Sequence, residues 1–431
     1  MRKLALNDEI LLSIQQPARY IGGEVNMVNK DPKKVDVRFA MCFPDVYEIG
    51  MSHLGIQILY DMFNRRDDVY CERVYSPWTD LDKLMREKNI PLFAVESQDP
   101  VKDFPLDSKE VMSLFQNTSA LGIEPEDIGG CKLGALGIPE FGTDFAMQML
   151  IDAQPKYFSD LVRISGLSHG TDVWLGNAQT LIQEGKATIQ TAICTRDDIM
   201  VYLIGMGLEE GLAFTIMESV RKGKGLKDEW IKEMTDHGVP DWYIWSCKKI
   251  KYMFPKAHAA AYVMMAWRIA YCKVFYPLAY YAAFFSIRAS GVSYVLMCQG
   301  REKLEYHLAD YKKRMDTLSK KEQDTLRDMR IVQEMYARGF EFTAIDIFKA
   351  SARSFQIVDG KLMPSLSSID GLGEKAADAI VFAAEDGPFL SREDFINRTK
   401  VTKTVCDLMG ELGLLGDLPE SNQLSLFDMV M

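Results

Sequence analysis

The sequence predicts a mixed α/β protein that is mainly helical, with a partial α/β unit at the N-terminus. Three observations predict this class. An apolar, β-branched run at 35–43 is followed by a turn and a helical pattern, which is how an α/β unit opens. The run 259–287 indicates buried helices, and 301–339 shows strong charge periodicity of the helical kind. The 48% hydrophobic content of the 431 residues is ample for real cores, and such a length suggests roughly two to four domains.

Residues 1–104 form the first expected domain, a truncated α/β segment. The run 35–43 predicts a strand, a Pro-Asp pair predicts the turn after it, and 53–63 predicts an amphipathic helix. A second strand is expected at 92–95. Strand edges left open in such a segment would favour aggregation unless something covers them.

Two features of this segment could suggest chemistry but are better explained structurally. His53 could be imagined as a metal ligand, yet its position favours a helix-starting or core histidine. Asp80 and Asp82 have acid-x-acid spacing, but they lie in a polar helical stretch and are interpreted as solvated.

Residues 105–290 form the second expected domain, which is helical. Its most apolar stretch, 259–287, contains Arg268, Lys273 and Pro277, so no uncharged run reaches the roughly 18 to 20 residues that a membrane span needs. Two buried helices are expected there, with methionines and aromatic residues as core filler. No membrane partner is expected.

A loop in this domain has the composition of an anion site. The run 161–170 is an apolar helix end that breaks into Gly, Ser and His residues, so that backbone N–H groups, the Ser168 hydroxyl and the His169 imidazole could face a phosphate. The alternative is an ordinary helix C-terminus with Gly166 as the terminator. The residues alone leave both interpretations open.

Two runs, 221–227 and 248–256, are basic without any acid. Solvated faces explain most charge runs, but the interspersed glycines and adjoining aromatics fit a surface that tracks a nucleic-acid backbone. Arg221, Lys222 and Lys224 are the candidate DNA contacts. Because the chain carries a formal charge of −11, such cations must be concentrated locally, and salt should weaken the contact steeply.

Residues 291–360 are expected to form a helical connector with short strands. A strand pair is predicted around 355–358, because Asp359 and Gly360 supply a hairpin-type turn.

Residues 361–418 contain a glycine hairpin. Gly371 and Gly373 bracket Leu372 just before a helical pattern, so their N–H groups lie at a helix N-terminus with no side chain in the way. A duplex phosphate can approach such a loop closely without any reading of base sequence. An ordinary glycine turn is the alternative. The flanking pattern favours a helix-hairpin-helix motif, with Lys375 beside the loop and a weaker second unit at 402–415 making a tandem pair.

Residues 419–431 are expected to be a flexible tail. Its apolar residues need an outside partner: Leu426 and Phe427 would fill a pocket while Gln423 hydrogen-bonds at the rim. A frayed tail packing on its own domain is the alternative. The peptide resembles the sliding-clamp-binding peptide of bacterial replication proteins, which implies the sliding clamp (beta subunit) as a partner. Its residues are Gln423, Leu424, Ser425, Leu426 and Phe427.

Cysteine usage and the N-terminus favour a cytoplasmic protein. The eight cysteines form no C-x-x-C pair, so neither a zinc site nor a disulfide framework is indicated. The first residues meet acids before any long apolar region, so no signal peptide is expected.

From about 106 to 427 the sequence closely resembles the C-terminal end of the PolC-type DNA polymerase III alpha subunit of low-GC Gram-positive bacteria. The matching blocks are 137–144, 161–177, 195–200 and 252–262. The resemblance implies a DNA-directed DNA polymerase of chromosome replication, a nucleotidyltransferase. It makes 105–290 the later fingers region and 361–418 the tandem helix-hairpin-helix duplex-binding domain.

The resemblance also implies phosphate contacts. From the residues alone, Arg196 next to two aspartates would only form a surface ion pair, which contributes little to stability. In these polymerases the fingers supply cations to the phosphates of the incoming dNTP, and Arg is suited to this by its rigid fork of donors. The implied dNTP and phosphate-binding residues are Arg163, Ser168, His169, Arg196, Lys256 and His258.

Catalysis is not implied for the isolated chain. Nucleotidyl transfer needs two metal ions held by palm carboxylates, and in this family those aspartates precede the position of Leu106. Asp197 and Asp198 lie in the fingers block and cannot inherit that role. We therefore expect the chain to bind double-stranded primer–template DNA, the clamp and, weakly, dNTP phosphates, but to be inactive. It is expected to hold no cofactor, with magnesium expected only for the complete polymerase.

A different resemblance covers the first domain. The run 43–64 resembles the N-terminal, cobalamin-binding-like portion of an uncharacterised radical SAM protein family, and this resemblance stops near Asp103. Nothing after it supplies the C-x-x-x-C-x-x-C ligands of an iron–sulfur cluster. The abrupt join between Asp103 and Leu106 suggests a truncated fusion. A radical SAM or cobalamin-family function is the alternative to the polymerase one.

Overall fold

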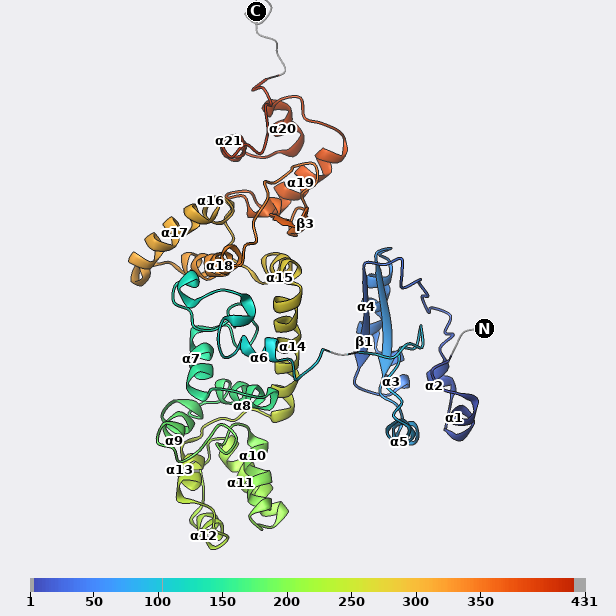
Figure 1. Cartoon of the computed structure of the whole chain (residues 1–431), viewed down its shortest axis with the longest axis vertical. Coiled ribbons are helices and arrows are strands. Elements are labelled where there is room, and N and C mark those ends of the chain that lie inside the picture. The colour runs from blue at the N-terminus through green and yellow to red at the C-terminus, as the bar shows by residue number, and fades with distance from the viewer. Residues whose placement is uncertain (1–3, 103, 422–431) are drawn as a thin grey trace, which may run out of the picture. The chain divides into compact units, whose positions relative to one another are not determined.

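The computed structural model describes residues 4–102 and 104–421. The chain divides into two compact units, Met1–Phe104 (unit 1) and Pro105–Met431 (unit 2), and Figure 1 labels most of their helices. The expected mixed, mainly α class is confirmed, because long helices dominate and the strands form two short two-stranded sheets within the described residues.

Unit 1 is built on a parallel strand pair. Strand β1 (Val37–Phe43) pairs with β2 (Val69–Tyr75) in a register that runs from Val37 opposite Val69 to Phe43 opposite Tyr75. Parallel neighbours need a crossover connection, and helices α3 (Tyr47–Ser52) and α4 (Leu54–Asn64) provide it. Helices α1 (Asp8–Ser13), α2 (Ala18–Ile21) and α5 (Thr79–Lys88) complete the unit.

Unit 1 confirms one local prediction, a helix that starts at His53, and contradicts another, a strand at 92–95. His53 starts α4, because its imidazole Nδ1 accepts a hydrogen bond from the Ile56 N–H at 3.3 Å. The prediction of a strand at 92–95 was wrong. Those residues form only an isolated bridge between Phe93 and Pro100, since the chain reverses at once and the Glu96 carboxylate turns inward to Arg73.

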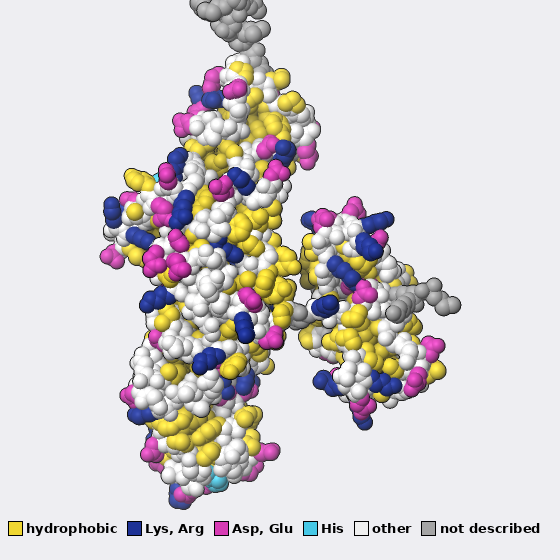
Figure 2. Space-filling view, viewed as in Figure 1, with side chains coloured by type: hydrophobic (Ala, Val, Ile, Leu, Met, Phe, Trp, Pro, Cys, Tyr) yellow, Lys and Arg dark blue, Asp and Glu magenta, His cyan; other side chains and the backbone are white. Residues whose placement is uncertain are grey.

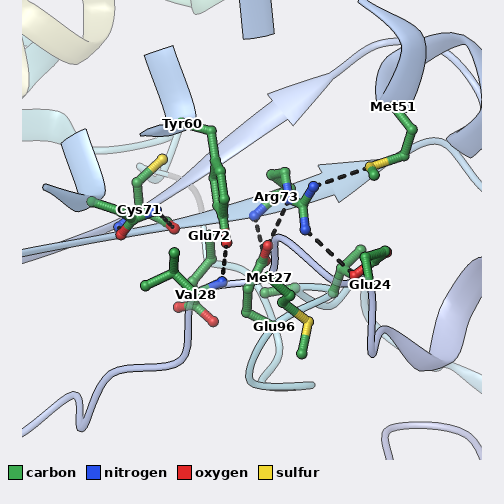
Figure 3. Close-up of polar contacts among 12 residues, drawn as sticks. Glu24, Met27, Val28, Met51, Tyr60, Cys71, Glu72, Arg73 and Glu96 are labelled. Atoms are coloured by element: carbon green, nitrogen blue, oxygen red, sulfur yellow. Dashed lines mark hydrogen bonds and ion pairs between the residues drawn. The ribbon is translucent and has the colours of Figure 1, made fainter. Parts of the chain in front are cut away.

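Arg73 is the centre of a buried polar network in unit 1 (Figure 3). Its side chain is 1% exposed and its Nε lies 2.6 Å from Oε1 of Glu96, which is itself fully buried. The Arg73 N–H donates to the second Glu96 oxygen at 2.6 Å, Glu24 lies 3.4 Å away, and the guanidinium covers the Tyr60 ring at 4.3 Å. Removal of either partner of this pair would leave an uncompensated buried charge, which is strongly destabilising.

Unit 2 begins as an all-helical region. Its α-helices are α6 (Lys109–Ser113), α7 (Asp144–Ala153), α8 (Phe158–Ser168), α9 (Gln179–Gln183), α10 (Arg196–Gly205), α11 (Glu210–Arg221), α12 (Asp228–Asp236), α13 (Asp241–Lys249), α14 (Lys256–Phe275) and α15 (Pro277–Ala283). Short helical turns join them: η1 (Ser119–Leu121), η2 (Pro125–Ile128), η3 (Trp174–Ala178) and η4 (Phe284–Arg288).

Helices α14 and α15 are the two buried helices expected from 259–287. Pro277 ends one helix and begins the next, and Trp267 is 1% exposed. Among the described residues, no helix combines the length and apolar composition that a membrane crossing requires.

A buried ion pair links α14 to the connector of unit 2. Lys273 and Glu334 are both 0% exposed, and Nζ of Lys273 lies 2.8 Å from Oε1 of Glu334. The same ammonium donates to the carbonyls of Gly134 at 2.8 Å and Leu136 at 2.5 Å, and Tyr281 donates to Glu334 at 2.8 Å. Burial lowers the pKa of Lys273, and the Glu334 carboxylate opposes that shift.

The connector and the C-terminal region come next along the chain. The connector contains α16 (Tyr294–Met297), α17 (Arg301–Lys313), η5 (Met315–Thr317) and α18 (Lys320–Ala337), then the antiparallel pair β3 (Gln356–Val358) and β4 (Lys361–Met363). The predicted strand pair is confirmed, because Asp359 and Gly360 both have positive φ, 49° and 76°. The last elements are η6 (Leu366–Ser368), α19 (Glu374–Glu385), α20 (Arg392–Thr399) and α21 (Lys403–Glu411).

Candidate nucleic-acid and nucleotide interface

The glycine hairpin is built as a close-approach loop. Gly371 has φ +82°, the left-handed region that favours glycine, and Leu372 is 6% exposed and packs into the C-terminal core. Gly373 precedes α19 with φ −73°, no side chain caps that helix, and a Cβ placed on Gly373 would meet nothing within 4 Å. The helix N-terminus is therefore open to an anion.

A second turn packs against the first. Lys400 ends α20 in the left-handed conformation, and Thr402 caps α21 by accepting from the Val405 N–H at 3.4 Å. A Cβ placed on Gly371 would lie 3.4 Å from the Val405 side chain. The two turns therefore share one core, as a tandem arrangement requires. Lys375 lies in the first turn of α19, beside the Gly373 N-cap.

The basic run after α11 is partly neutralised. Arg221 and Lys222 both pair with Glu218, the latter at 2.7 Å. These contacts, that of Arg221 first, lower the pKa of Glu218 to about 2. Lys224 is exposed and makes no ion pair within the described residues. Only one of the three candidate cations is therefore immediately available.

Four of the expected phosphate-binding residues gather where α8, α10 and α14 meet. Arg163 and Lys256 each lie 3.6 Å from the Asp198 carboxylate. Arg196 lies 4.0 Å from Asp197, and its Nε is buried without a hydrogen-bond partner in the described part of the chain. His258 lies in the first turn of α14, close to Lys256.

Asp197 and Asp198 have structural duties in this cluster. Asp198 accepts from the N–H groups of Cys194 at 3.2 Å and Thr195 at 2.9 Å, in the capping box of α10. Asp197 accepts from the N–H of Lys256 at 2.7 Å. Both carboxylates therefore fix the ends of helices and the positions of cations.

A row of aromatic rings includes His258 of this cluster. His169 stacks on Phe254 with ring centroids 4.9 Å apart, Phe254 contacts His258 at 4.6 Å, and His258 contacts Tyr262 at 4.5 Å. His169 also pairs with the Glu140 carboxylate at 2.5 Å. The row joins the loop after α8 to the first turns of α14.

The loop at 161–170 is a true helix end, but Gly166 is not its terminator. Helix α8 continues to Ser168 and His169 caps it. A Cβ on Gly166 would lie 2.6 Å from the carbonyl oxygen of Cys194, so this glycine permits close helix–loop packing. The interpretation of Gly166 as the terminator was wrong. The Ser168 hydroxyl donates to the Ser165 carbonyl at 2.9 Å.

The fold brings together segments distant in sequence. Besides the cation cluster, the basic loop at 221–224 contacts this region, because the Met253 N–H donates to the Arg221 carbonyl at 3.3 Å. The glycine hairpin is a separate site, held to the connector through Asp370, which accepts from the Ser293 hydroxyl at 2.8 Å. The expected clamp peptide at 423–427 lies outside the described residues.

Sequence reasoning missed Glu140, Phe254 and Tyr262. All three lie in or next to the blocks that carried the family resemblance, so those blocks were the available signal. Their contacts with His169 and His258 depend on the fold. Figure 2 shows why charge alone was a weak guide: basic and acidic side chains are interspersed over the visible face of the molecule.

Comparison with known proteins identifies two family segments. Residues 82–238 match the bacterial DNA polymerase III alpha subunit finger domain, and residues 339–424 match a helix-hairpin-helix motif. The matches give no support to a radical SAM or cobalamin function.

Curated relatives cover most of the chain. The chain is 52% identical over 326 residues to the PolC-type DNA polymerase III of Caldanaerobacter subterraneus subsp. tengcongensis and 54% identical over 326 residues to that of Bacillus subtilis. Each alignment covers 76% of this chain, but the chain spans only 23% of the relative's length. The finger and helix-hairpin-helix matches and this identity together show that the chain belongs to the PolC-type DNA polymerase III family, of which it carries a C-terminal part.

Proposed function

We propose that unit 2 binds the duplex of a primer–template DNA without reading its sequence. The observation that carries this proposal is the open glycine hairpin at the N-terminus of α19, inside the helix-hairpin-helix match. Glycines at 371 and 373 leave the backbone N–H groups accessible, and such groups contact phosphates rather than base edges. A replication protein needs this indifference to sequence.

The cation cluster would form a second, weaker phosphate-binding site, separate from the hairpin. Arg163, Arg196 and Lys256 surround the end of α10, and the Arg196 Nε lacks a partner within the described residues. We assign this cluster, with Ser168, His169 and His258, to the phosphates of an incoming dNTP. Its cations already face Asp197 and Asp198, so a triphosphate would compete with those carboxylates and bind weakly.

Polymerisation is not assigned to this chain. In the complete polymerase, magnesium ions would supply the charge that activates the primer hydroxyl. Asp197 and Asp198 do not fit the role of the carboxylates that hold these ions, because both accept helix-capping or backbone hydrogen bonds. No group of three or more His, Cys, Asp or Glu suited to a metal occurs in the described ranges. Primer extension by the purified chain that is lost on Arg196→Ala would overturn this assignment.

The tail adds a protein partner to the proposal. Gln423, Leu424, Ser425, Leu426 and Phe427 have the pattern of a clamp-binding peptide, with two apolar anchors at its end. The sliding clamp is therefore the proposed protein partner. Replacing Leu426 and Phe427 with Ala should abolish capture of the chain by immobilised clamp without changing its affinity for DNA.

The hairpin has a sharp test in Gly373→Ala. A Cβ at this position clashes with nothing and the backbone φ is ordinary, so folding should be unchanged, yet the methyl group would stand where a phosphate approaches. We expect a blunt duplex to bind at least about fivefold more weakly in fluorescence anisotropy, about 1 kcal/mol. Gly205→Ala, which also meets nothing within 4 Å, is the matched control. Equal affinities for the two variants would contradict the proposal.

A further inference from the structure

Two cavities in unit 2 adjoin one another. A cavity of about 410 Å³ is lined by Ser168, His169, Phe145 and Arg288, and a larger one of about 1020 Å³ extends between α7 and α18. Leu136, Gly142, Thr143 and Arg327 line both. These shared residues place the two cavities side by side. We name them together the α7–α18 cleft, and its smaller cavity includes Ser168 and His169 of the proposed phosphate site.

The cleft is strongly basic for a chain with a net charge of −11. Its lining contains the cations Lys132, Arg288, Lys312, Arg327 and Arg330. The acids in the lining are Glu140, which pairs with His169, and Asp144, which lies 3.0 Å from Arg330.

The available cations are spread along the cleft. Lys132, Arg288 and Lys312 are exposed and make no ion pair within the described residues. Arg327 and Arg330 lie one turn apart on α18 and so share a face, but Arg327 pairs with Asp324 at 3.2 Å and Arg330 with Asp144 at 3.0 Å. The unpaired positive charge of the described lining therefore comes from Arg288 in the smaller cavity and from Lys132 and Lys312 in the larger one.

The lining of the cleft combines open backbone with an exposed aromatic ring, which suits a flexible nucleic-acid strand with flat bases. Gly129 and Gly130 have φ of +66° and +85°, and a Cβ on Gly130 would meet nothing within 4 Å, so the backbone there is open. Phe145 is 47% exposed in the smaller cavity and Met315 is 58% exposed in the larger one. Exposed aromatic rings beside a basic groove are the surfaces on which unpaired bases stack.

We propose that the α7–α18 cleft binds a single-stranded DNA extension that continues from the duplex held by unit 2. The inference rests on the proposed duplex binding and adds a site for the unpaired strand. The backbone phosphates would contact Lys132, Lys312 and Arg330, and bases would stack at Phe145. Charge complementarity commits the cleft to a polyanion, and the exposed aromatic ring favours a nucleic acid over an acidic peptide.

The test compares a blunt duplex with the same duplex carrying a ten-nucleotide single-stranded extension, by fluorescence anisotropy over a range of salt concentrations. We expect the extension to strengthen binding of the whole chain at least about tenfold, since base stacking on an aromatic ring adds to the phosphate contacts. Lys132→Ala with Lys312→Ala should remove most of that gain. For two lost contacts to a single strand, the salt slope of the extended duplex should fall by about 1.4.

The control is Lys33→Ala with Lys34→Ala, which removes the same charge from exposed lysines of unit 1. It should leave the gain unchanged. Phe145→Leu should reduce the gain without changing the salt slope, because it removes stacking and no charge.

Failures of the two proposals can be distinguished. No binding of the blunt duplex by the wild-type chain would refute the duplex proposal. Blunt-duplex binding without a gain from the extension would overturn the cleft proposal alone, as would a gain that survives the Lys132 and Lys312 changes. Stronger competition by poly-glutamate than by a thymidine oligonucleotide of equal charge would assign the cleft to an acidic protein instead.

Discussion

The two units each bury an ion pair but differ in how much apolar surface they cover. In unit 1 every residue of β2 is buried while no residue of β1 is, and β1 pairs with β2 alone in the described residues. Helices α3 and α4 expose the apolar side chains Ile49, Leu54, Ile58, Leu59 and Met62. Figure 2 shows apolar side chains reaching the surface of this unit.

Unit 2 covers its apolar residues more fully. One hydrophobic core runs from Val111 to Leu362, and a second supports the hairpin helices. Parallel sheets are normally buried on both faces, so unit 1 should be the less stable of the two. We therefore expect DNA binding to depend on the stability of unit 2 and to be independent of unit 1.

The largest effect is expected from Lys273→Met. The change leaves the Glu334 carboxylate buried and unpaired, which should lower the free energy of unfolding of unit 2 by about 3 to 5 kcal/mol. Urea denaturation followed by tryptophan fluorescence measures it, because five of the six tryptophans, the buried Trp267 among them, lie in unit 2. The double change Lys273→Met with Glu334→Leu should recover the part of the loss that comes from the unpaired carboxylate, but not the hydrogen bonds that Lys273 donates to the Gly134 and Leu136 carbonyls. A loss below about 1 kcal/mol for the single change would show that the pair is not desolvated.

Arg73→Leu should destabilise unit 1 by about 3 kcal/mol, because it strands the buried Glu96. Limited proteolysis should then cleave within residues 1–104 much faster. Binding of a blunt duplex should stay within about twofold of wild type, less than 0.5 kcal/mol. A larger loss of DNA affinity would contradict the independence of DNA binding from unit 1, since it would make unit 1 part of the binding site.

Gly371→Ala should cost about 1 to 2 kcal/mol of unit 2 stability, because φ +82° is unfavourable for an L-residue. Gly373→Ala, two residues away with φ −73°, should cost nothing measurable. Thermal unfolding of the two variants distinguishes the roles of the two glycines, because Gly371 sets the loop conformation and Gly373 leaves the loop open. Equal stabilities would show that the hairpin does not hold this conformation.

The smallest effect concerns Glu218. Glu218→Gln releases Arg221 and Lys222, so duplex affinity at low salt should rise a few-fold, less than about 1 kcal/mol, with a steeper salt slope. The pKa of Glu218 is lowered from 4.5 to about 2, so its stabilising contribution is complete above pH 4.5. That contribution is lost as the pH falls toward 2. The stability difference between wild type and the variant should shrink over that range, and a difference that grows would contradict the pairing.

Sequence reasoning succeeded where local rules decide the structure. Asp359 and Gly360 specify a hairpin turn, Pro277 divides two helices, and His53 starts one. It failed where a distant partner decides. Residues 92–95 have strand composition, but Glu96 is drawn to Arg73, and Gly166 is a packing glycine because Cys194 lies against it.

The candidate site was predictable in composition but not in arrangement. The family resemblance supplied Arg163, Arg196 and Lys256, yet only the fold shows that Asp198 organises two of them. The α7–α18 cleft has no local sequence signal, because its cations come from separate loops and helices and are basic together only after folding.

Hydrogen–deuterium exchange of the whole chain, with and without a blunt duplex, tests most directly whether unit 2 alone holds DNA. We expect slower exchange at 371–376 on binding, with no change across residues 4–102. Slower exchange confined to unit 1, or unchanged exchange at the hairpin while the duplex is bound, would contradict it.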